Sequence, residues 1–199
     1  MRGAGEILGT RQHGYIASVG FHLYTRLLAQ AVGNQRLAQG LPVPEGSLLQ
    51  IREGHIPVNV ELPLSIGIPV DYVSDQNIRL RVYRRLADIQ HESEIDAVTE
   101  EYVDRFGPLP DPLKNLLYQL RVKLRAEAVG LASISVEGEQ MVLRFPSLPE
   151  GINSRNLPNL GPHARAGKNA YWMAFASHQA DWQQQLLDTM DQIKIQLGQ

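Results

Sequence analysis

Apolar residues recur every three or four positions in five segments of the chain, which predicts five amphipathic helices. The segments cover about residues 17–32, 75–90, 93–105, 111–129 and 178–197. Ser74 is the expected N-cap of the second helix, because its short polar side chain can accept a hydrogen bond from a free amide. Gly107 is expected to end the third helix. Asp111 as N-cap, followed by Pro112, predicts the start of the fourth helix, and Gly130 predicts its end.

Alternation of apolar and polar residues with a period of two marks the strands. Residues 56–62 alternate, and Pro57 favours a position at a sheet edge or at the start of a strand. Residues 134–136 and 141–145 also alternate, on either side of a turn at 137–140. This arrangement predicts a β-hairpin.

Residues 171–175 are expected to form a third strand of the same sheet, whereas 146–169 are rich in Pro, Gly and Asn and predict an irregular connection. Residues 1–14 are a glycine-rich loop, and 33–54 hold the Gly and Pro residues typical of a linker. The predicted fold class is therefore α+β. Helices pack on a small, mostly antiparallel sheet, preceded by a glycine-rich loop and a helical linker.

Composition excludes several classes of protein. The 199 residues include no cysteine, which excludes a disulfide scaffold and thiolate metal sites and fits a reducing cytoplasm. No apolar run approaches the roughly 18 residues that a membrane-spanning helix needs. The net charge is −2 and the pI is about 6.3, so the chain as a whole has no electrostatic reason to coat nucleic acid.

The catalytic motifs sought in the sequence are absent. The nearest match to a phosphate-binding P-loop, from Gly161 to Lys168, has one residue too many, and Asn169 replaces the required Ser or Thr. The six histidines show no metal-ligand spacing, and there is no G-x-S-x-G nucleophile motif. We therefore expect no catalytic residue, no metal site and no bound cofactor in this chain.

One motif is specific. Residues 2–14 read R-G-A-G-E-I-L-G-T-R-Q-H-G. This segment resembles the end of the translocation motif R-G-x-G-E-x-L-G-x-x-Q-x-G, which RecG helicases share with transcription-repair coupling factors (Mfd). The resemblance implies that Arg2 and Gln12 help to couple ATP hydrolysis to movement on duplex DNA. Both side chains suit such a contact, because an arginine fork binds bidentately and a glutamine donates and accepts at once.

The following residues distinguish the two families. Residues 19–24 read V-G-F-H-L-Y, which is similar to the coupling factors and not to RecG. Four further segments are similar to the coupling-factor C-terminal domain, in the same order: 60–63, 68–73, 79–86 and 104–110. The expected organisation is the end of the motor motif with a linker helix at 1–32, a linker at 33–54, and a regulatory domain at 55–199.

The resemblance implies a function for the whole protein. A coupling factor binds stalled RNA polymerase, moves on DNA with ATP and magnesium in its motor, and recruits UvrA in the cytoplasm. Its C-terminal domain docks on an N-terminal UvrB-like domain and masks the UvrA-binding surface. Glu101 and Asp104 match acidic positions that the family uses for this clamp, and their spacing of three places them on one helical face.

Other interpretations stay open from the sequence alone. Glu101 and Asp104 could belong to a solvated face with only local ion pairs. The chain could also be the tail of a RecG-type helicase, a stand-alone protein–protein adaptor, or a small α+β enzyme, although no motif supports the last.

Overall fold

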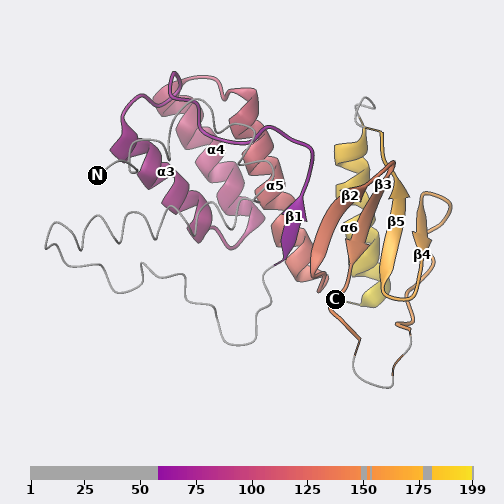
Figure 1. Ribbon diagram of the computed structural model, residues 1–199. Helices are drawn as coiled ribbons and strands as arrows, with labels where there is room; N and C mark the ends of the chain where they lie inside the picture. Colours follow the sequence, from indigo (N-terminus) through magenta and orange to yellow (C-terminus); the bar gives the residue numbers. More distant parts are fainter. Residues whose placement is uncertain (1–57, 149–151, 153, 177–180, 199) are drawn as a thin grey trace, which may run out of the picture.

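The computed structural model describes residues 58–148, 152, 154–176 and 181–198. Within these residues the chain forms four helices and five strands (Figure 1). In chain order they are β1 (Asn59–Glu61), α3 (Gln76–Asp88), α4 (Glu92–Phe106), α5 (Asp111–Ala128), β2 (Ser133–Glu137), β3 (Gln140–Arg144), β4 (Ala164–Ala166), β5 (Ala170–Ala174) and α6 (Trp182–Leu197). The predicted glycine-rich loop, the helix over 17–32 and the linker over 33–54 lie outside the described residues.

The strands form one sheet in the order β1-β2-β3-β5-β4. β1 runs parallel to β2, and every other neighbouring pair is antiparallel. α6 packs across one face of this sheet, while α3, α4 and α5 form a separate helical layer beside it (Figure 1). The predicted α+β class, with helices on a small and mostly antiparallel sheet, is confirmed.

The hairpin that the alternation predicted is β2–β3, and its two strands are joined by Gly138 and Glu139. Gly138 has a φ of 61°, a left-handed conformation that glycine adopts without steric cost. One strand was missed: β4 lies inside the segment 146–169, which was expected to be irregular. Its three residues are too few to show an alternating pattern.

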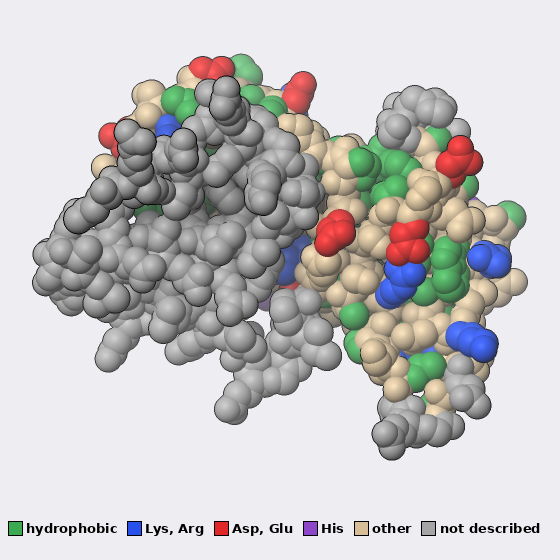
Figure 2. All heavy atoms as spheres, in the orientation of Figure 1, with side chains coloured by type: hydrophobic (Ala, Val, Ile, Leu, Met, Phe, Trp, Pro, Cys, Tyr) green, Lys and Arg blue, Asp and Glu red, His purple; other side chains and the backbone are tan. Residues whose placement is uncertain are grey.

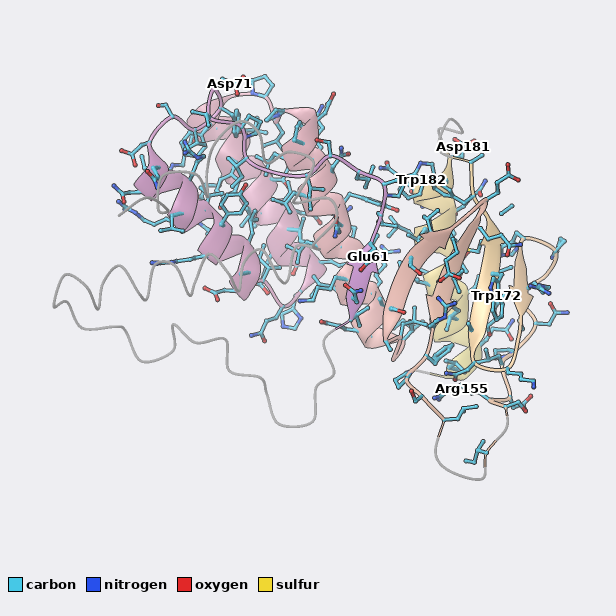
Figure 3. All side chains as sticks on the ribbon, viewed as in Figure 1. Glu61, Asp71, Arg155, Trp172, Asp181 and Trp182 are labelled. Atoms are coloured by element: carbon cyan, nitrogen blue, oxygen red, sulfur yellow. The ribbon has the colours of Figure 1, made fainter. Side chains whose placement is uncertain are left out.

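Figure 3 labels Trp172 on β5 and Trp182 at the first turn of α6. Trp182 is buried in the core against Tyr118 and Phe175, whereas Trp172 carries the guanidinium of Arg165 over its ring at 5.2 Å. Figure 2 shows acidic and basic side chains on the exposed face of the sheet, with the acidic ones toward the top of the view and the basic ones lower.

Two of the predicted helix caps were wrong by one residue. Asp75, and not Ser74, accepts a hydrogen bond from the amide of Ile78 at the start of α3. The N-cap of α5 is Pro110, so Asp111 lies in the first helical turn. At α3 two neighbouring short polar residues, Ser74 and Asp75, could each cap the helix, whereas α5 begins after Pro110 without a side-chain cap.

The buried side chains form two cores. The sheet core lies between the sheet, α6 and the second half of α5, and the helical core lies between α3, α4, the first half of α5 and the segment 66–73. In α5, Leu113, Leu116, Leu117 and Leu120 belong to the helical core, whereas Val122 and Ala126 belong to the sheet core. A single helix therefore contributes to both cores.

Gln119, at the boundary between the two halves of α5, is buried with only 5% of its surface exposed. Its Nε2 donates a hydrogen bond of 2.8 Å to the carbonyl oxygen of Val60 in the edge strand β1. The backbone amide of Asn59 donates a hydrogen bond to the carbonyl oxygen of Ala132, on the side of β2. Successive residues of a strand direct their backbone groups to opposite sides, so those of Val60 point to the open edge of the sheet. The glutamine thus satisfies a buried carbonyl at the sheet edge.

We predict that Gln119→Leu destabilises the chain by about 1–3 kcal/mol, because the leucine fills the site but leaves the Val60 carbonyl without a donor. Urea unfolding followed by tryptophan fluorescence measures the loss. Gln196→Leu, at an exposed position of α6, is the control and is expected to change stability by less than about 0.5 kcal/mol. Equal stability of the two variants would contradict the assigned role of Gln119.

Candidate functional site

The acidic residues of α4 are candidates for a binding surface, and their place depends on how the helix is anchored. Glu94 accepts a hydrogen bond of 2.9 Å from the His91 amide at the start of the helix. Ile95, Val98 and Tyr102 recur on one face and are buried in the helical core. The acids therefore lie on the remaining faces of the helix.

Acids in the first half of α4 are paired with arginines of α5. Glu92 accepts from Arg125 at 2.8 and 3.1 Å, and Asp96 lies 2.5 Å from Arg121. Arg125 also contacts Asp191 of α6 at 2.7 Å, so its side chain connects three helices. The hydrogen bond to Glu92 raises the pKa of the Arg125 guanidinium. Both acids are therefore already paired within the domain.

Glu101 lies between two arginines. Its Oε2 is 2.5 Å from Nη1 of Arg85 in α3, and its Oε1 is 2.9 Å from Nη1 of Arg105, one turn further along α4. The Glu101 side chain is 28% exposed. The hydrogen bond from Arg105 lowers the pKa of the Glu101 carboxyl, and the charge of Arg85 acts in the same direction. Both carboxylate oxygens are therefore engaged within the domain.

Asp104 differs from Glu101 although it lies only three residues away. Its side chain is exposed, and among the residues that the structure describes it has no hydrogen-bond or ion-pair partner. Val103 beside it is 44% exposed. The predicted clamp pair thus consists of one engaged carboxylate and one free carboxylate.

Tyr72, from the loop before α3, contacts the end of α4 that carries these two acids. The Tyr72 hydroxyl lies 3.1 Å from the carbonyl oxygen of Tyr102 and 3.0 Å from that of Gly107. The ring of Tyr72 also meets Phe106 edge to face at 5.8 Å. Gly107 ends the helix with a φ of 86°, as the sequence predicted. The one hydroxyl proton of Tyr72 is thus shared between two carbonyls, and the hydroxyl joins the loop that holds Tyr72 to the end of α4.

Sequence reasoning did not single out Tyr72, although it lies in the family-like segment 68–73 and Phe106 lies in 104–110. The sequence did contain a signal for this contact, because each of the two segments holds an aromatic residue next to a turn. Asp71, labelled in Figure 3, lies in the same loop, next to the pinned end of α4. The loop and the helix end form one surface.

The remaining predicted site residues, Arg2 and Gln12, lie outside the described residues. In the described part of the chain, no three His, Asp or Glu side chains are grouped so that they could hold a metal ion. No described helix is both long enough and apolar enough to cross a membrane.

Residues 62–153 match the family model of the TRCF domain. The chain is 34% identical over 156 residues to a transcription-repair-coupling factor of Mycobacterium tuberculosis, and 39% identical over 145 residues to that of Haemophilus influenzae. These alignments cover 78% and 73% of this chain. The chain belongs to the TRCF domain family.

The aligned part of this chain spans only 13% and 12% of the lengths of these two relatives. A solved structure, described as the C-terminal domain of transcription-repair coupling factor, superposes with a TM-score of 0.56 at 20% sequence identity. The superposition covers 70% of this chain and 95% of that one, so the two share a fold.

We predict that Arg125→Met destabilises the TRCF-domain chain by about 1–2 kcal/mol, since the methionine keeps the apolar stem but loses the contacts to Glu92 and Asp191. Urea unfolding at low and high salt is the measurement, and the difference from wild type should shrink as salt screens the network. Lys114→Met is the control. It removes a pair in which Asp111 is 86% exposed, and it should be nearly neutral. A neutral Arg125→Met would contradict the assignment.

Proposed function

We propose that this chain is the C-terminal regulatory module of a transcription-repair coupling factor, an ATP-dependent DNA translocase. In this proposal its domain docks on a UvrB-like domain of the same protein and masks the surface that binds UvrA. The observation that best supports a docking role is the state of Asp104. In this TRCF domain the Asp104 carboxylate is exposed to solvent beside the exposed Val103, at the end of α4 that Tyr72 contacts.

The chemistry of this surface suits a partner that carries arginines. Asp104 can accept a bidentate guanidinium, and Val103 can pack against the stem of the same side chain. A releasable contact between domains buries on the order of 600–1,500 Å². Reversing a 99:1 population takes about 5.5 kcal/mol of differential binding. A few exchangeable ion pairs fit that range better than a large apolar interface.

The proposal extends to residues outside the described part of the chain. Residues 1–32 would be the end of the motor motif and 33–54 the linker to the regulatory domain. Arg2 and Gln12 would contact a motor that binds ATP and magnesium and moves on duplex DNA. Stalled RNA polymerase and UvrA would be the indirect partners, in the cytoplasm.

The clamp is tested by charge reversal in the full-length factor. We expect Glu101→Arg combined with Asp104→Arg to increase UvrA binding, measured by fluorescence anisotropy with labelled UvrA, because an arginine partner would then be repelled. Asp104→Arg alone should act in the same direction. It is the cleaner variant, since Glu101→Arg would place a third guanidinium beside Arg85 and Arg105.

Glu139→Arg is the matched control, because Glu139 is an exposed acid at the β2–β3 turn, on the sheet side of the domain. It changes the net charge equally and should leave UvrA binding unchanged. If the Asp104 variant melts normally and binds UvrA no better than the Glu139 variant, the clamp assignment is wrong.

The motor contact is tested separately. Arg2→Ala and Gln12→Ala in the intact motor should leave ATP hydrolysis active while slowing movement on DNA, because the loop would no longer connect the two events. ATPase turnover and triplex displacement measure the two activities. Triplex displacement at the wild-type rate in both variants would refute the role of these residues.

A further inference from the structure

Glu101 as folded is not an acidic site. The carboxylate carries one negative charge, and Arg85 and Arg105 carry one positive charge each, so the three side chains together carry a net charge of +1. A cation that approaches Glu101 is therefore repelled until one of the two arginines leaves. Asp104 nearby meets no such competition among the described residues.

The two arginines are not held equally. Arg105 lies on the same helix as Glu101, and its guanidinium carbon is also 5.3 Å from the centre of the Phe106 ring. That ring packs in turn against Tyr72. Arg85 comes from α3 and has Glu101 as its one ion-pair partner among the described residues, whereas its exposure of 52% is close to the 56% of Arg105. Arg85 is the side chain that can exchange at least cost.

We propose that Arg85 is an internal competitor for Glu101, which weakens the docking of this domain and keeps it releasable. This inference rests on the proposed function, because it assigns a regulator to the same surface. In the undocked state Arg85 occupies Glu101. In the docked state an arginine of the partner domain replaces it, while Arg105 stays in place and Asp104 forms the second contact. Each docking event therefore breaks one ion pair as it forms another.

The test uses the full-length factor with one dye at Gln196→Cys, on the exposed side of α6, and a second dye on the UvrB-like domain. Energy transfer between them reports the ratio of docked to undocked molecules. We expect Arg85→Gln to raise this ratio about 2- to 5-fold, the range that an exposed ion pair typically contributes. UvrA binding should fall accordingly.

Two variants control for charge and for folding. Arg84→Gln removes the same charge from the same helix, at an exposed position with no ion pair among the described residues, and it should leave the ratio unchanged. Arg85→Lys keeps a cation beside Glu101 and should behave as wild type. A melting curve of each variant establishes that the domain is folded.

The outcomes separate the two proposals. If Asp104→Arg releases the domain but Arg85→Gln behaves like Arg84→Gln, Arg85 is not a competitor and the clamp still stands. A lower docked ratio in Arg85→Gln would also overturn the inference, because Arg85 would then support docking. If Asp104→Arg leaves the docked ratio unchanged, the clamp itself is wrong. A higher docked ratio in Arg85→Gln would then have to arise through other residues.

Discussion

The two cores of this domain depend on one helix. The first half of α5 packs with α3 and α4, and its second half packs against the sheet and α6. Because an α-helix is stiff over its 18 residues, the helical layer and the sheet cannot shift independently. Gln119 fixes the junction through the carbonyl of Val60, and Arg125 ties the outer side through Glu92 and Asp191. The position of α4 relative to the rest of the domain follows from these contacts.

This constraint also decides which charges remain available. The acids in the first half of α4 are paired with arginines from the second half of α5, whereas the first half of α5 contributes buried leucines and no arginine. Glu101 is reached instead by Arg85 of α3 and by Arg105 of its own helix. Asp104, three residues further along, has no ion-pair partner among the described residues. A helix whose sequence is acidic throughout therefore presents a free carboxylate close to its end.

The sequence predicted what depends on local pattern. The helices and the hairpin follow from periodicity, because each element buries one continuous apolar face. The strand β4 could not be predicted, since three residues carry no pattern and its pairing with β5 is set by the fold. Of the contacts to Glu101, the one from Arg105 follows from the spacing of four on a helix. The one from Arg85 joins two helices and depends on their packing, so no local pattern reveals that Glu101 is already engaged.

The rigidity of the α4 terminus gives these ion pairs their effect. The last turn of a helix usually frays, and a frayed turn would absorb the loss of a surface contact by local rearrangement. Here the Tyr72 hydroxyl and the end of the helix at Gly107 hold that turn, and the ring of Phe106 packs beneath it. A change in the partner of Glu101 is then not absorbed locally. In the proposed docking, such a change would pass into the equilibrium between docked and undocked domains, and a contact of modest strength would be sufficient to set that equilibrium.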